Sequence, residues 1–191
     1  MGSDLLGQTI FAVNIFKYSV TNWEEKKPKL LSLLDFSDDD VVQSKLPQHT
    51  DYYSNQGRPP YFKQWCEILE EDLNNIFQQG DVITPLLKNS TDTSKWQLWS
   101  QRYNNQQYHS CHNHGVGNLS CVLYLEFDKS VHSPTWFHSP FNDPFTGYNQ
   151  EYVPQVDEGD IILFPAMLLH EAPNNTSNVK RTIMSFNIPI G

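Results

Sequence analysis

The sequence predicts a mainly β fold, a jelly roll or β-sandwich, with helices near its N-terminus. Two observations support this prediction. Helical spacing of apolar residues is confined to the stretch before Gly80, whereas the chain after Pro85 is a series of short runs rich in β-branched and aromatic residues. Several short strands with helices restricted to the first half favour a closed β architecture backed by helices. A length of 191 residues fits a single domain.

The N-terminal half is expected to support the β core. Residues 9–20 predict a strand, and Asn22 is an expected N-cap for a helix over residues 23–34. Residues 36–60 contain prolines and polar side chains, which predict a long loop. Residues 61–79 carry apolar side chains at helical spacing and end at a glycine, which predicts one long helix.

The C-terminal half predicts four well-defined strands, at residues 96–103, 119–127, 159–165 and 181–188. Residues 128–155 hold several prolines and aromatic residues and predict short strands joined by loops. This succession of strands is what a jelly roll requires.

Composition narrows the possible functions. The formal net charge is −9, which argues against broad nucleic-acid binding because such binding depends on Lys and Arg neutralising phosphates. The three cysteines, Cys66, Cys111 and Cys121, form no CxxC pair and indicate a reducing compartment. With no signal peptide or membrane-spanning run expected, we predict a cytoplasmic protein without a membrane partner.

Histidines form the most informative pattern in the chain. His112 and His114 are two residues apart, so on an extended strand both side chains face the same side. With His170 as a third ligand from a distant strand they would form a facial set that leaves positions open for a co-substrate and O2, as non-haem Fe(II) oxygenases require. Ordinary histidines of polar loops and a zinc site remain alternatives, although no second Cys/His pair completes a structural zinc site.

Further motifs lie in a fixed order around these histidines. They are His112-Asn113-His114, the strand Leu119–Leu125, the strand Glu158–Pro165, His170, and Arg181–Asn187. In this order they resemble the Fe(II)/2-oxoglutarate-dependent oxygenases, in particular a small bacterial and phage branch with an H-x-H…H pattern and a subgroup similar to prolyl hydroxylases. The resemblance covers residues 95–191 and implies a double-stranded β-helix, a jelly roll similar to that of cupins, backed by helices.

The resemblance also implies roles for particular residues. His112, His114 and His170 would bind the metal, although the wider family has a carboxylate where His114 stands. Arg181 would hold the distal carboxylate of 2-oxoglutarate through two parallel hydrogen bonds. Tyr124, Ser120 and Tyr103 would complete this cosubstrate site. The hydroxyl residue that often follows the arginine by two positions is absent, since Ile183 stands there.

An activity follows from the same resemblance. The cofactors would be Fe(II), 2-oxoglutarate as cosubstrate and O2, with ascorbate in support, and the reaction would hydroxylate an unidentified substrate with release of succinate and CO2. The whole chain, 1–191, would be one oxygenase domain, with helical support and a lid in 1–94 and the β core with the metal site in 95–191. If a phage encodes the chain, the cytoplasm is that of the host.

Two alternatives remain open at this point. A three-histidine, cupin-type metal dioxygenase that uses no 2-oxoglutarate would not need Arg181. A non-enzymatic jelly-roll binding module would keep its function without His112 and His170. Fold alone does not decide between these functions.

Overall fold

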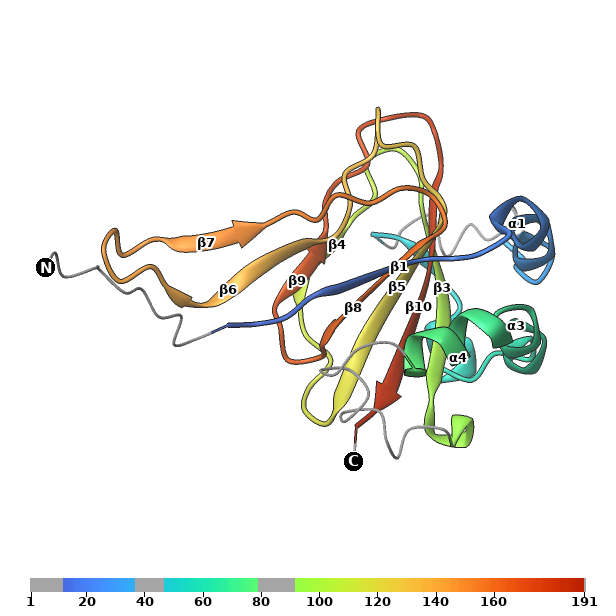
Figure 1. Cartoon of the computed structure of the whole chain (residues 1–191). Coiled ribbons are helices and arrows are strands. Elements are labelled where there is room, and N and C mark those ends of the chain that lie inside the picture. Colours follow the sequence, from blue (N-terminus) through green and yellow to red (C-terminus); the bar gives the residue numbers. More distant parts are fainter. Residues whose placement is uncertain (1–11, 37–46, 79–91, 191) are drawn as a thin grey trace, which may run out of the picture.

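Two antiparallel sheets form the molecule, with helices packed on one side (Figure 1). The computed structural model describes residues 12–36, 47–78 and 92–190. The predicted jelly roll is confirmed: the described chain is mainly β, with two sheets facing each other and helices confined to the N-terminal half.

The larger sheet has six strands, and its two central strands, β5 and β10, are buried along almost their whole length. Side chains of β5 alternate between the two faces, since Leu119, Cys121 and Leu123 pack in the cluster that includes the helices, whereas Val122 and Tyr124 pack in the cluster between the sheets. The strands, in spatial order, are β1 (Phe16–Ser19), β8 (Asp160–Pro165), β5 (Asn118–Glu126), β10 (Arg181–Pro189), β3 (Gln97–Tyr103) and β2 (His49–Thr50).

The smaller sheet carries the histidines. Its strands, in spatial order, are β4 (His109–His112), β9 (His170–Ala172), β6 (Trp136–Asn142) and β7 (Asn149–Tyr152). In Figure 1 the hairpin of β6 and β7 extends outward from the rest of the sheet. The short strands β6 and β7 confirm the prediction for residues 128–155.

Helices cover the face of the large sheet that points away from the small one. Trp65, Leu69 and Phe186 belong to one buried cluster, and the rings of Trp65 and Phe186 meet edge to face at 4.9 Å. The helices are α1 (Trp23–Leu31), α2 (Tyr52–Asn55), α3 (Phe62–Ile68) and α4 (Glu70–Gln78), with a 3-10 turn, η2 (Thr93–Lys95). None of the described helices is long and apolar enough to cross a membrane.

The single helix predicted for residues 61–79 is wrong in one respect, because the structure divides it into α3 and α4. The break falls at Leu69, whose φ of −103° and ψ of 10° are not helical. Leu69 is fully buried, so the break keeps the apolar side chains on the core side. The glycine expected to end the helix lies outside the described residues.

Other element boundaries differ more modestly. The helix predicted for 23–34 ends at Leu31, and Asn22 precedes it in a left-handed conformation without a side-chain capping bond. Within the loop predicted for 36–60, β2 and α2 are regular, and residues 37–46 lie outside the described part. The strand predicted for 9–20 is β1, four residues long, with 9–11 outside the described part.

Candidate metal centre

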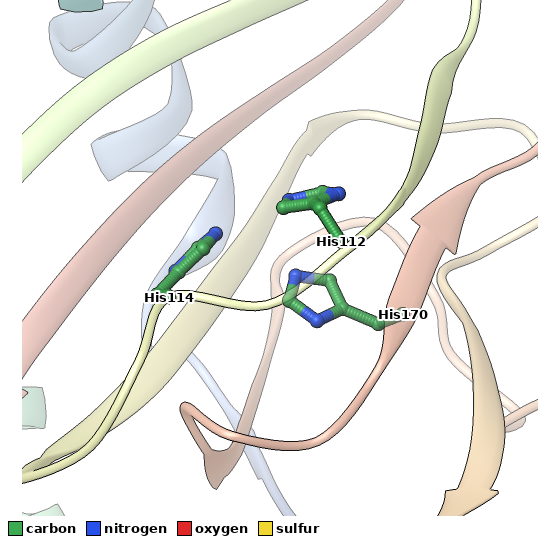
Figure 2. Close-up of side chains that lie close together, drawn as sticks. All are labelled: His112, His114 and His170. Carbon is green, nitrogen blue, oxygen red and sulfur yellow. The ribbon is translucent and has the colours of Figure 1, made fainter.

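Strand pairing brings the three predicted metal ligands together. β4 and β9 pair so that His112 lies opposite His170, and His114 follows β4 by two residues. One nitrogen from each ring lies within 4.8 Å of the other two. Figure 2 shows the three rings grouped around a common space, with His112 and His114 on one segment and His170 on the neighbouring strand. This convergence is the geometry that a three-ligand metal site needs.

Backbone carbonyls fix two of the rings. The Nδ1 of His112 lies 2.7 Å from the carbonyl oxygen of Ser110, and the Nδ1 of His170 lies 2.8 Å from that of Leu168. Because a carbonyl oxygen only accepts hydrogen bonds, each Nδ1 carries the hydrogen, which leaves the lone pair on Nε2. Rings held in this way are typical of histidines that bind a metal through the other nitrogen.

A side-chain network fixes the third ring. The Nδ1 of His114 lies 2.7 Å from Ser120 Oγ and 3.1 Å from Asn187 Oδ1. Ser120 donates its own hydrogen to Asn187 Oδ1 at 2.7 Å, and the Asn187 amide nitrogen donates to Gln97 Oε1 at 3.1 Å. With those hydrogens committed, the Nδ1 of His114 is a donor, and its Nε2 lone pair is available like those of the other two rings.

The environment keeps these histidines neutral. Burial, together with the neighbouring histidines, lowers the pKa of His170 to about 3. Burial also lowers the pKa values of His112 and His114. Metal binding needs unprotonated imidazole, and neutral imidazoles suit iron, zinc, copper and nickel. The donor set therefore fits a divalent metal ion.

A fourth histidine lies beside this group. The ring of His109 stacks on that of His112 at 3.9 Å between centroids, and its Nδ1 lies 3.1 Å from the Gln101 amide nitrogen. His109, His112 and His114 line a cavity of about 370 Å³. The metal group therefore opens onto a space large enough for a small ligand.

Arg181 lies at the start of β10 and is almost completely buried. Its Nη1 donates to the Ser133 carbonyl at 2.6 Å, its Nη2 donates to that of Pro173 at 3.0 Å, and the guanidinium lies 4.3 Å from the centre of the Tyr103 ring. No carboxylate of the described residues forms an ion pair with it. A buried cation without a carboxylate partner is a suitable place for an anionic ligand.

Two of the three other predicted cosubstrate residues lie near this guanidinium. The charge of Arg181 influences the hydroxyls of both Tyr103 and Tyr124, whose pKa values burial raises. Tyr124 donates to Thr135 Oγ1 at 3.0 Å and accepts from its backbone nitrogen at 3.1 Å. Among the described residues, the buried Tyr103 hydroxyl has no hydrogen-bond partner. An orphaned buried hydroxyl beside an arginine fits a carboxylate ligand.

The hydroxyl of the third residue, Ser120, makes other contacts than those predicted. It shares the inner face of β5 with Tyr124, but its hydroxyl contacts His114 and Asn187, so it orients a histidine. Asn187 and Gln97 belong to the same network and were not singled out from the sequence. Asn187 lies within the recognised motif, but nothing in its spacing reveals which ring it contacts.

One family model matches the part of the chain that contains this site. Residues 97–187 match the model of a family described as "Putative 2OG-Fe(II) oxygenase". The matched residues include most of the strands of the β core. The match begins at β3, ends within β10 and includes all three histidines and Arg181. A search of curated protein sequences found no relative.

Two solved structures with TM-scores above 0.5 have the same fold at low sequence identity. A Pseudomonas putida prolyl-4-hydroxylase has a TM-score of 0.55 and 10% identity, with 93% of each chain covered. HygX from Streptomyces hygroscopicus, with nickel and 2-oxoglutarate bound, has a TM-score of 0.57 and 11% identity, covering 93% of this chain and 83% of HygX. The chain spans about half (49%) of the carbocyclase SnoK of nogalamycin biosynthesis, with a TM-score of 0.40, 12% identity and 49% of this chain covered.

Proposed function

We propose that this protein is an Fe(II)- and 2-oxoglutarate-dependent dioxygenase that hydroxylates its substrate, with His112, His114 and His170 as the metal ligands. The observation that carries the proposal is that all three imidazole rings have the same tautomer, with the hydrogen on Nδ1. Each Nδ1 is held by an acceptor, so three Nε2 lone pairs remain for one ion. A structural histidine cluster has no need for three identical tautomers.

Arg181 is the proposed anchor for the distal carboxylate of 2-oxoglutarate, with Tyr103 and Tyr124 beside it. Support comes from the buried guanidinium without a carboxylate partner among the described residues and from the orphaned Tyr103 hydroxyl. Phe137 and Phe164 contact His170 and belong to the same buried cluster as both tyrosines. The proposed metal and carboxylate sites therefore border one apolar core.

Bound Fe(II) together with O2 would supply the oxidising power, with 2-oxoglutarate converted to succinate and CO2, and ascorbate would keep the metal reduced. The chain's own residues bind and orient. The three histidines fix the metal position, the buried arginine fixes the far end of the cosubstrate, and the phenylalanines beside His170 exclude water. Residues 1–191 act as one domain in this proposal, with 1–94 as support and lid.

His114 gives this site a distinctive charge. Three neutral histidines leave both positive charges of Fe(II) uncompensated by the protein, whereas a carboxylate would neutralise one of them. The bound keto acid then supplies the first negative charge at the metal. We expect 2-oxoglutarate to bind the metal-loaded protein far more tightly than the metal-free protein.

The direct test is succinate formation from 2-oxoglutarate. We expect Fe(II)-dependent succinate release that is lost in His170→Ala and reduced in Arg181→Lys. His138→Ala is the matched control, since His138 lies on β6 and outside the three-histidine group. Iron binding without succinate formation in the presence of substrate candidates would contradict the proposal.

The replacement of a carboxylate by His114 favours one second candidate, a three-histidine dioxygenase that uses no 2-oxoglutarate. This alternative predicts oxidation of a substrate by the Fe(II)-loaded chain alone. It also predicts full activity in Arg181→Lys, because nothing would bind the guanidinium during turnover.

A further inference from the structure

The cavity beside the histidines has an unusual lining. Among the described residues no aspartate, glutamate, lysine or arginine lines it, although the chain as a whole is acidic. Five carboxamides contribute to its wall: Gln48, Gln97, Gln101, Asn113 and Asn187. The remaining lining besides the histidines is hydroxyl-bearing or aromatic: Thr50, Tyr52, Tyr53 and Trp99. Such a wall offers hydrogen bonds without compensating a charge on a ligand.

Most of these carboxamides are already committed to the protein. Asn187 and Gln97 bond to each other, and Asn113 Oδ1 accepts from the backbone nitrogen of Gly115 at 3.1 Å. Gln48 is different. Its side chain is 6% exposed, and its Oε1 has no donor among the described residues. A bound group with a hydrogen to donate would satisfy this oxygen.

His109 supplies the complementary donor. Ser185 Oγ donates to Gln101 Oε1 at 3.1 Å, which directs the Gln101 amide nitrogen toward His109 Nδ1. Because that nitrogen can only donate, Nδ1 of His109 is the acceptor and its hydrogen is on Nε2. His109 is thus the opposite tautomer from the three proposed ligands. Within the described chain the only side-chain hydrogen bond of His109 is the one with Gln101, and His109 lines the cavity.

We propose that this cavity is the substrate site and that it takes a small uncharged molecule with both a hydrogen-bond donor and a hydrogen-bond acceptor, with His109 and Gln48 as the residues that determine this specificity. A carboxamide and a pair of neighbouring hydroxyls both have this chemistry. The inference rests on the proposed function, because it is the proposed metal beside the cavity that makes its occupant the substrate. A volume of about 370 Å³ is near the lower end of the range for small-molecule sites, which suits a ligand of this size.

Aromatic rings form an apolar part of the wall. Tyr52 meets Trp99 edge to face at 5.3 Å and Tyr53 at 5.6 Å, and Trp99 in turn meets the ring of His114 at 5.4 Å. The wall therefore continues to the metal group. A ligand held between the polar pair and these rings lies next to the proposed iron position.

The test uses three sets of small fragments matched in size: neutral amides and polyols, carboxylates, and amines. Binding to the full chain is measured by ligand-observed NMR, both metal-free and loaded with Zn²⁺ and 2-oxoglutarate, with Zn²⁺ as a diamagnetic substitute. We expect neutral fragments to dominate the hits. Amides and polyols are scored separately, so the experiment identifies whether the site prefers a carboxamide or a pair of neighbouring hydroxyls. Predominance of charged fragments, or no fragment binding at all, would overturn the inference.

Three variants assign the hits to the cavity. His109→Phe keeps a ring to stack on His112 but removes the donor, and His109→Gln restores a donor without the ring. Gln48→Met keeps the length of the side chain but removes the acceptor. Loss of one hydrogen bond should weaken the neutral hits about five- to tenfold in His109→Phe and in Gln48→Met, with partial recovery in His109→Gln. Unchanged affinities in both donor and acceptor variants would exclude these residues as the specificity pair.

Metal content, measured separately for each variant, distinguishes failure of this inference from failure of the proposed function. Protein that binds Zn²⁺ but shows no preference for neutral fragments refutes the inference and leaves the proposed function standing. Protein that binds neutral fragments but no metal refutes the proposed function, and the inference that these fragments are substrates falls with it.

Discussion

Two buried polar clusters on different parts of the molecule are built in opposite ways. In the first, between α1, α4 and β1, the fully buried Asp72 carboxylate accepts from the hydroxyls of Tyr18 and Thr21, from the Thr21 backbone nitrogen and from Lys26, at 2.5–3.0 Å. In the second, three neutral histidines and a buried arginine lie beside one apolar core, and none of them has a carboxylate partner among the described residues.

The difference separates structure from function. The charged and hydrogen-bonding groups around Asp72 have their partners within the chain. This cluster therefore joins helices to the sheet and needs no ligand. The histidine and arginine cluster contains lone pairs and a positive charge that the chain does not satisfy, which is the state expected of a binding site. The following predictions test that contrast, from the largest expected effect to the smallest.

Removing a proposed ligand should abolish metal binding without unfolding the chain. In His170→Ala we expect at least a 100-fold loss of Fe(II) affinity, because loss of residues that merely orient ligands already reduces metal affinity about 10- to 100-fold. Metal titration measures the affinity, and far-UV circular dichroism of the metal-free variant checks the fold. Retention of wild-type affinity would remove His170 from the site.

Arg181→Lys should affect the cosubstrate and not the metal. Lysine keeps the positive charge but lacks the two parallel donors, so we expect the KM for 2-oxoglutarate to rise about 10- to 100-fold while Fe(II) affinity stays unchanged. Steady-state succinate formation measures the KM. An unchanged KM would place the cosubstrate carboxylate elsewhere.

Asp72→Asn should show the converse behaviour, with lost stability and an intact metal site. It removes the charge that pairs with Lys26, so we expect unfolding to become easier by about 2–3 kcal/mol and Tm to fall by about 5–10 °C. Thermal unfolding measures the stability, and Fe(II) titration of the folded variant is the control. A change in metal affinity without a change in Tm would contradict the contrast between the clusters.

The same carboxylate gives a pH dependence. Burial alone would raise the pKa of Asp72, but hydrogen bonds from Lys26, Thr21 and Tyr18 outweigh it and hold this pKa below its usual value. A lowered pKa in the folded state means that Asp72 stabilises the protein above its unfolded pKa, about 3.9, and that this contribution is lost as the pH falls through the folded pKa. Below about pH 4 the stability of the wild type should approach that of Asp72→Asn, as measured by urea unfolding across pH.

Ser120→Ala should have the smallest effect on the second cluster. It removes one of the two groups that hold the His114 ring, while Asn187 Oδ1 remains at 3.1 Å. We expect metal affinity to fall about tenfold, with 2-oxoglutarate binding at saturating metal unchanged. A raised KM for 2-oxoglutarate at full metal occupancy would instead restore Ser120 to the cosubstrate site, as first expected from the sequence.

Much of the fold was predictable because each strand or helix leaves a pattern of apolar residues in its own stretch of the sequence. The runs around Leu123 and Ile162 are continuously apolar because both faces of those strands are covered, and this is visible in the sequence. The break between α3 and α4 at Leu69 could not be predicted from the sequence, since a buried leucine suits one long helix as well as two short ones. The packing of α3 and α4 against the sheet decides between them.

The sequence was enough to predict which histidines lie together, but not which atoms contact one another around them. His112, His114 and His170 could be selected because ligand spacing and motif order are linear features. The roles of Ser120, Asn187 and Gln97 depend on which atoms meet across three strands, and the opposite tautomer of His109 depends on the orientation of Gln101. Such contacts between distant residues leave no periodic signal in a single sequence.

The central claim is that one site holds both the metal and the cosubstrate. Mixing the purified protein with Fe(II) and 2-oxoglutarate in the absence of O2 tests it most directly, because an Fe(II)–keto acid complex has a weak visible charge-transfer band. We predict that this band forms in the wild type, is lost in His170→Ala and requires a higher 2-oxoglutarate concentration in Arg181→Lys. Iron that binds without producing the band would contradict the claim and favour a three-histidine dioxygenase that needs no 2-oxoglutarate.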